Sequence, residues 1–235
     1  MRLMVLALIA MLAAFAPPAR GTRYVFEVAD AAGQAGAVDA MRKRVEAAGI
    51  NASVEPKGPV RIEVHAARTV AQEKITRLLS RPGIMTFNLV DSAADVDDYP
   101  LFEARNNRTA KPNLSDKGAP LVIEMDSILT GEQVESAKAE IDPYTSQPAI
   151  QIRLKPNGAR AFGAVTTQSV GRQLAIVVDD QIMLAPFIRM PITAGFITLT
   201  GAFTMAEAQE YAAALQAPLP GLVKLIEIGT YGPGQ

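Results

Sequence analysis

The chain has 235 residues, 49% of them hydrophobic and 20% charged, a composition typical of a folded globular protein. Its net charge of −1 offers no basic excess to neutralise phosphates, which argues against a nucleic-acid partner. The absence of cysteine and the single histidine exclude disulfides, thiolate nucleophiles and histidine-rich zinc sites. These facts disfavour an enzyme, and we expect no cofactor and no metal.

Residues 1–20 have the pattern of an export signal. Arg2 precedes an apolar run over 3–16, which is shorter than the roughly 20 residues that a membrane-spanning helix needs. Small residues at 14–16 fit signal cleavage, whereas Pro17-Pro18 directly behind them fits it poorly. We therefore expect an exported, periplasmic protein whose signal is cleaved or, alternatively, stays as an anchor in the inner membrane.

Strands and helices alternate along the next part of the chain. Alternating or continuous apolar residues predict strands over 24–28, 52–55, 60–64 and 84–90. Apolar residues three and four positions apart predict a helix over 35–48 ended by Gly49 and a helix over 70–79 begun by Thr69. The resulting order, β-α-β-β-α-β, is the ferredoxin-like pattern, so we predict a ferredoxin-like base over residues 21–93.

Residues 94–119 are polar and predict a linker between two lobes. Asp95, Asp97 and Asp98 suggest a calcium loop, but their spacing departs from that of an EF-hand and no bidentate glutamate follows at the required distance. A solvated linker is therefore the better interpretation.

Residues 120–217 predict a second, α+β lobe. Its strands are expected over 121–125, 149–154, 173–178, 181–188 and 196–199, a short amphipathic segment over 130–141, and its helices over 157–170 and 204–215. Asp179-Asp180 predicts a tight hairpin turn, and Thr204 with Glu207 predicts a capping box. A last strand over 222–228 is expected to rejoin the base, so that residues 218–235 complete the base and the second lobe is an insertion.

The sequence does not present a catalytic constellation. Glu124 and Asp126 share one strand face, but no partner base or nucleophile is visible near them in the sequence, and the GxSxG motif is absent. His65 is expected on the polar face of its strand. A hydrolase or ligand-binding enzyme is the least supported of the functions considered.

Apolar residues are dense over 183–203, more than a core of this size calls for. Most of them are expected in the core, but flexible methionine combined with aromatic residues is also typical of an adaptable surface for apolar peptides. The candidates for peptide binding are Met183, Phe187, Met190, Ile192 and Phe196. Composition also suggests hinges between the lobes at Gly118 and Pro218.

An ordered set of motifs resembles the SecD family. The motifs lie at residues 134–143 with Gln147-Pro148, and at 158–162, 171–179, 185–188, 192–195, 200–204, 207–209, 219–220 and 232–233. Upstream, residues 41–45 with Gly49, and residues 85–90, are similar to the start of the same domain. The resemblance covers most of residues 35–233.

The resemblance implies a fold and a function. The first periplasmic domain of SecD has a ferredoxin-like base and an inserted head, and the head is thought to capture emerging preprotein and to pivot on the base. SecD continues into membrane spans beyond the point that matches Gln235, so the resemblance predicts a freestanding module without the proton-driven part of SecD. The hairpin turn also differs from that of the family, because Asp179-Asp180 stands where Asp-Gly would be usual.

Two functions follow from these observations. The first is an exported module that binds unfolded preprotein or extended peptide and assists translocation, with a membrane SecD/SecF complex or the Sec translocon as a further implied partner. The alternative is a structural component that docks in a cell-envelope assembly and captures no peptide.

Overall fold

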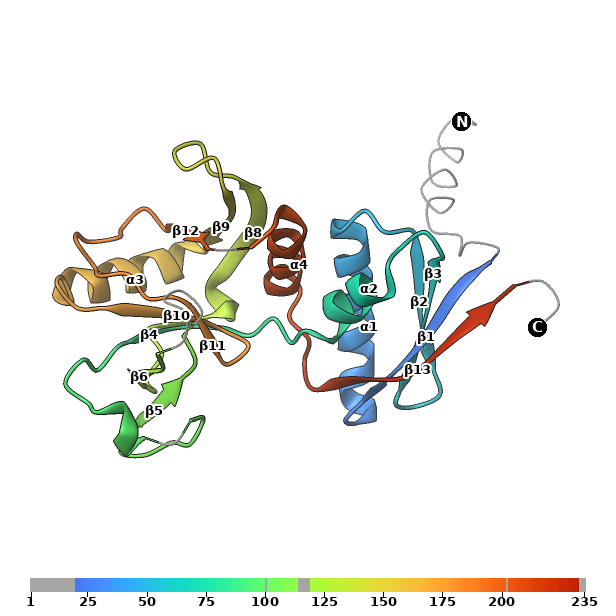
Figure 1. The fold of residues 1–235 in the computed structure, drawn as a ribbon, viewed down its shortest axis with the longest axis horizontal. Coiled ribbons are helices and arrows are strands. Elements are labelled where there is room, and N and C mark those ends of the chain that lie inside the picture. Colours follow the sequence, from blue (N-terminus) through green and yellow to red (C-terminus); the bar gives the residue numbers. More distant parts are fainter. Residues whose placement is uncertain (1–19, 100, 114–118, 202, 233–235) are drawn as a thin grey trace, which may run out of the picture. The chain divides into compact units, whose positions relative to one another are not determined.

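The computed structural model describes residues 20–99, 101–113, 119–201 and 203–232 (Figure 1). The chain divides into two compact units, residues 1–82 with 219–235, and residues 83–218. Residues 1–19 of the predicted export signal lie outside the described residues. Within the described ranges, no helix is both long enough and apolar enough to cross a lipid bilayer.

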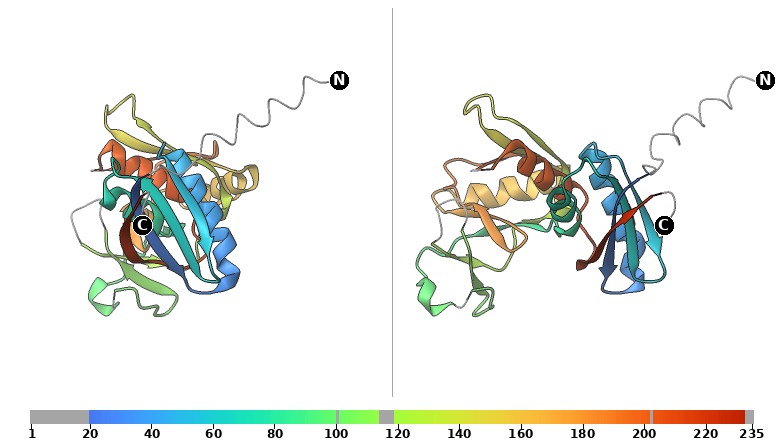
Figure 2. Two further views of the ribbon diagram at one scale, coloured as in Figure 1. Left: turned by 90° about the vertical axis from the view of Figure 1, so that its right-hand side faces the viewer. Right: turned by 45° about the vertical axis from the view of Figure 1, so that its right-hand side comes forward.

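The first unit is a four-stranded antiparallel sheet with two helices on one face (Figures 1 and 2). Its elements are β1 (Gly21–Val28), α1 (Ala31–Ala47), β2 (Ala52–Lys57), β3 (Arg61–Ala67), α2 (Gln72–Ser80) and β13 (Val223–Tyr231). The strand order is β13-β1-β3-β2, with every neighbouring pair antiparallel. This is the ferredoxin-like arrangement, so the predicted fold class is confirmed.

The strand that closes this sheet differs from the prediction. We expected residues 84–90 to be the final strand of the β-α-β-β-α-β pattern. That place is taken by β13, the strand expected to rejoin the base, which pairs with β1 along its whole length. The insertion therefore begins at residue 83, directly after α2, and residues 84–93 are part of the second unit.

Local signals determine where the helices of the first unit begin and end. Asp30 caps α1 by accepting a hydrogen bond from the Gly33 N–H at 2.8 Å. The helix therefore begins at Ala31, four residues before the predicted start. Gly49 ends the helix in the left-handed conformation, at φ 62°, as predicted. The predicted cap of α2 is wrong, because Ala71 occupies that position, not Thr69.

The sheet face opposite the helices carries a charged cluster around Glu63. Glu63 lies 3.1 Å from His65 Nε2, 3.4 Å from Lys57 Nζ and 3.5 Å from Arg23 Nη1. Burial alone would raise the pKa of Glu63, but the hydrogen bond to His65 and the charge of Lys57 outweigh it and leave the pKa below its ordinary value. His65 therefore lies on a polar strand face, where it also stacks on Tyr231 with ring centroids 4.4 Å apart.

The second unit packs two sheets and two helices around a large buried cluster, and a smaller buried cluster contains Val90, Ile123 and Ile182. Its elements are β4 (Met85–Leu89), η2 (Val96–Asp98), β5 (Arg108–Lys111), β6 (Leu121–Glu124), β7 (Leu129–Thr130), η3 (Gly131–Gln133), β8 (Val134–Ile141), β9 (Pro148–Leu154), α3 (Pro156–Gln168), β10 (Leu174–Val178), β11 (Gln181–Leu184), β12 (Phe196–Thr200) and α4 (Met205–Gln216). The sheets are β11-β10-β4-β7 and β12-β9-β8, and β5 and β6 form a separate ribbon. The predicted capping box of Thr204 and Glu207 starts α4.

The structure corrects two predictions in this unit. β4 is central in its sheet, paired with β10 and β7, because its side chains are buried on both faces: Met85, Phe87 and Asn88 are each at most 3% exposed. Residues 94–113 do not link two lobes. They stay within the second unit, where β5 pairs with β6 and Arg108 forms an ion pair with Asp91.

Candidate functional site

The segment between β11 and β12, residues 185–195, carries most of the predicted binding residues. Its first half is paired to the start of β10: the Leu174 N–H donates to the Pro186 carbonyl at 2.9 Å, and the Ile188 N–H to the Arg172 carbonyl at 2.9 Å. Ile188 is 3% exposed and is part of the core. This half of the loop is therefore fixed by backbone bonds and by one buried anchor.

Helix α3 holds the second half of the loop. The buried hydroxyl of Thr166 accepts a hydrogen bond from the Ile192 N–H at 2.9 Å. Gly195 adopts φ 70°, and a Cβ at this position would come within 2.7 Å of the Ala159 Cβ, so only glycine fits here without a shift. The loop is thus held against α3 at two points.

Three of the five predicted binding side chains are on the surface. Phe187, Met190 and Phe196 are 63%, 69% and 54% exposed. Because the loop is anchored through its other residues, it presents these apolar groups without having to fold around a ligand.

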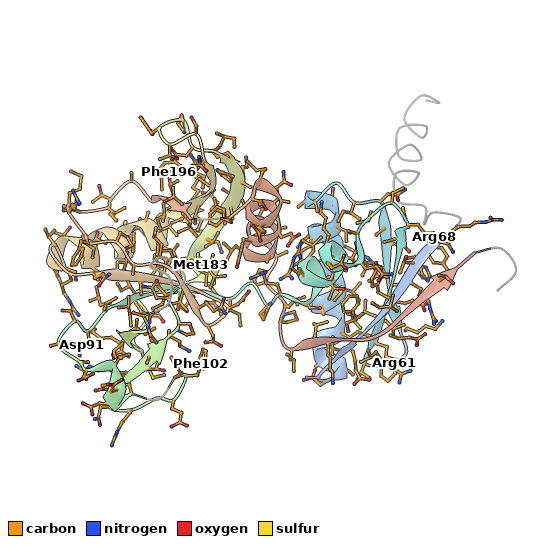
Figure 3. The ribbon with its side chains drawn as sticks, viewed as in Figure 1. Arg61, Arg68, Asp91, Phe102, Met183 and Phe196 are labelled. Atoms are coloured by element: carbon orange, nitrogen blue, oxygen red, sulfur yellow. The ribbon has the colours of Figure 1, made fainter. Side chains whose placement is uncertain are left out.

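Met183 and Ile192 lie elsewhere. Met183, labelled in Figure 3, is 9% exposed and belongs to the core. Ile192 is half-buried against the same core. The expectation that Met183 lines a surface is wrong, because β11 is covered on both faces: Ile182 packs into one buried cluster and Met183 into another.

Phe196 lies on an exposed strand edge. β12 is the outer strand of its sheet and pairs with β9. The Arg153 guanidinium lies 5.7 Å from the centre of the Phe196 ring and also pairs with Glu135 at 2.9 Å. An outer strand is the part of a sheet to which an extended peptide can be added as a further strand.

The carboxylates considered for catalysis are engaged separately. Glu124 pairs with Arg172 at 2.5 Å, and Asp126 accepts a hydrogen bond from Asn107 at 2.8 Å. Asp179 and Asp180 form the predicted tight turn, at φ 49° and 65°. The structure brings none of these carboxylates together as an acid–base pair.

Of the two hinge candidates, Gly118 lies outside the described residues, and Pro218 is exposed and is the last residue of the second unit. The chain passes between the units after Pro82 and again after Pro218. The Leu219 N–H donates to the Pro82 carbonyl at 2.9 Å, which ties the two passages together within the first unit.

Arg44 and Asp179 bind the backbone of residues 81–84, a role that the sequence did not predict for either of them. In the first unit, the fully buried Arg44 donates to the carbonyls of Leu78, Arg81 and Pro82, at 2.9, 2.5 and 3.0 Å. In the second, the Asp179 carboxylate accepts the N–H groups of Gly83 and Ile84, at 2.7 and 2.9 Å. The helical spacing did indicate that Arg44 is buried, because it lies three residues after the buried Met41 and residues at this spacing share a helix face.

Comparisons with known proteins agree with this architecture. Residues 106–220 match the family model described as SecDF, P1 head subdomain. The protein translocase subunit SecD of Calditerrivibrio nitroreducens is 30% identical over 210 residues, which are 84% of this chain and 40% of that protein. SecD of Acetobacter pasteurianus is 32% identical over 198 residues, 83% of this chain and 37% of that protein.

Solved structures of SecDF are similar as well. A crystal structure of SecDF in the super-membrane-facing form aligns with a TM-score of 0.70 and 26% identity, covering 91% of this chain and 30% of that chain. A second SecDF structure, described as a membrane component that enhances protein export, aligns with a TM-score of 0.65 over 87% of this chain and 98% of that chain. At 23% identity, the second match supports the fold alone.

A ferredoxin-like base with an inserted unit, similar to SecD subunits over most of its length, has the architecture of a SecDF-type base-and-head domain. The predicted resemblance to SecD is confirmed, and residues 106–220 are its SecDF P1 head subdomain. The chain spans about 40% of the length of the first curated relatives that it matches.

Proposed function

We propose that the second unit binds unfolded or extended polypeptide on the periplasmic side of the inner membrane and so assists protein translocation. The observation that carries this proposal is the anchored loop of residues 185–195, which with the start of β12 exposes Phe187, Met190 and Phe196. The match to SecD supports the setting, because the matched relatives are protein translocase subunits.

The binding is expected to be weak and reversible. Full burial of a Met or Phe side chain contributes about 1.5–3 kcal/mol, so three such contacts contribute about 4.5–9 kcal/mol. Ordering costs about 0.5–1.5 kcal/mol per immobilised side chain, so we expect Kd values weaker than about micromolar and near millimolar. An affinity in this range suits a protein that must release a moving chain.

The proposal is tested by titrating the isotope-labelled chain with unfolded presecretory peptides and following its amide NMR shifts. We expect saturable shifts over residues 185–198, and at least a fivefold weaker Kd for Met190→Asp and for Phe196→Asp. Tyr144→Asp is the matched control, because Tyr144 is 95% exposed in the same unit but lies at the β8–β9 turn.

Two results contradict the proposal. Unchanged binding by both loop variants would show that the loop is not the site. Absence of any shift at millimolar peptide would discard capture altogether and leave docking in an envelope assembly as the function. In either case, we propose to test whether the chain co-purifies with a partner, either a SecD/SecF complex or the Sec translocon.

A further inference from the structure

A second feature that fits polypeptide lies in the first unit, at the outer edge of β2. β2 ends the sheet order β13-β1-β3-β2, so one side of this strand pairs with β3, and no strand of the described residues lies beside its other side. Next to that edge is a cavity of about 360 Å³, lined by Arg42, Val45 and Glu46 from α1 and by residues 52–55 of β2.

The backbone of β2 directs hydrogen-bonding groups toward this edge. The Val54 carbonyl accepts a hydrogen bond from Arg42 Nε at 3.0 Å, which shows that it faces away from β3. In a strand, the N–H and C=O of one residue face the same side and every second residue repeats the direction, so the N–H groups of Ala52 and Val54 face this edge as well. Pro56, which has no N–H to donate, occupies the next outward position, where a proline is tolerated.

A side chain, not a strand, therefore covers the edge at Val54. Unpaired strand edges are templates for strand addition, and proteins commonly protect them with charged residues. Arg42 is such a protecting group: it reaches from α1 and satisfies one carbonyl, and rotation of its long side chain would free that carbonyl.

The cavity has an apolar floor and an acidic rim. Val45 and Val54 are 1% and 3% exposed. Glu46 and Glu55 are exposed at the rim beside Arg42, so the charged lining residues are net negative and suit a side chain with an aliphatic stem and a cationic end.

We propose that the β2 edge accepts an extended polypeptide segment as a fifth strand and places one lysine or arginine side chain of that segment in the cavity between α1 and β2. Arg42 leaves the Val54 carbonyl when the segment binds. The inference extends the proposed function, because its ligand is also polypeptide, but the site belongs to the other unit and depends on backbone pairing and charge.

The test uses the full chain and three synthetic peptides of alternating threonine and valine with one central lysine, norleucine or glutamate. Amide NMR shifts are measured during each titration. We expect shifts over residues 52–57, with the lysine peptide binding at least fivefold tighter than the norleucine peptide and the glutamate peptide weakest. Replacing both Glu46 and Glu55 with Gln should bring the lysine and norleucine peptides to within twofold of each other.

The decisive variant is Arg42→Ala, which removes the group that competes for the Val54 carbonyl. We expect it to bind the lysine peptide three- to tenfold tighter than the native chain, an increase that a merely structural role of Arg42 does not produce. Val54→Pro removes an outward N–H and should abolish binding. Arg68→Ala is the matched control, since Arg68 is an exposed arginine in the turn after β3, outside the cavity (Figure 3).

Four results would overturn the inference: absence of shifts at residues 52–57 with millimolar lysine peptide, no tightening by Arg42→Ala, equal binding of the glutamate peptide, or shifts there that depend on protein concentration without peptide. The last would identify a second copy of the chain as the occupant. Phe196→Asp separates this inference from the proposed function, because it should weaken the shifts over residues 185–198 and leave those over 52–57 unchanged.

Discussion

Replacing Arg44 with Met should destabilise the first unit strongly. Arg44 is fully buried and donates to three backbone carbonyls, of which that of Leu78 is buried and those of Arg81 and Pro82 are partly buried. Methionine fills a similar volume but leaves all three acceptors without this donor. A buried acceptor left unsatisfied costs about 1–3 kcal/mol, and a partly buried one costs less because water reaches it. Summed over one buried and two partly buried acceptors, we expect a total loss of about 3–5 kcal/mol.

The assay is urea unfolding followed by circular dichroism, with hydrogen exchange of residues 78–84 as the local readout. Lys43→Met on the same helix is the control: Lys43 is 63% exposed and forms an ion pair with the equally exposed Asp39, so we expect it to cost about 0.5 kcal/mol or less. A loss below about 1 kcal/mol for Arg44→Met, without faster exchange at residues 78–84, would refute the reasoning, because the carbonyls would then be satisfied without Arg44.

Three further predictions follow from single contacts. Thr166→Val should speed hydrogen exchange of the Ile192 amide and lower the free energy of unfolding by about 1 kcal/mol. The Thr167 hydroxyl bonds within α3, so Thr167→Val should leave exchange of that amide unchanged. Gly195→Ala should lower the melting temperature more than Gly171→Ala, because both have positive φ but only the first places a Cβ within 2.7 Å of a neighbour; equal effects would contradict the clash. The Glu63 carboxyl should titrate below its ordinary pKa of 4.5, so its contribution to stability is present above that pH and lost as the pH falls through the lowered pKa. Glu63→Gln should flatten this acid dependence of stability, and an NMR titration midpoint of Glu63 at or above 4.5 would contradict the prediction.

The base was predictable because its local signals agree with its packing. β3 alternates Ile62 and Val64, which are fully buried, with Glu63 and His65 on the polar face, a pattern that one covered sheet face produces. Gly49 ends α1 where the periodicity stops. In these elements each residue's environment is set within a few positions along the chain, so the sequence pattern is sufficient.

The placement of β4 was not predictable in the same way. Its apolar run predicts a buried strand, but no local property distinguishes a last strand of the base from a central strand of the insertion. The choice depends on pairing with β10, where Leu89 lies opposite Leu174, a contact between residues far apart in the sequence. A pattern of apolar residues shows that a strand is buried and leaves its partner open.

The candidate site shows the same limit at the level of side chains. Met183 and Met190 are both methionines in one apolar segment, yet the first is in the core and the second is 69% exposed. The difference arises because β11 is covered on both faces, whereas the loop is anchored through Ile188 and the Ile192 amide, which leaves Met190 facing outward. Composition therefore identifies the segment that is rich in apolar residues, and only the tertiary anchors decide which of them are exposed.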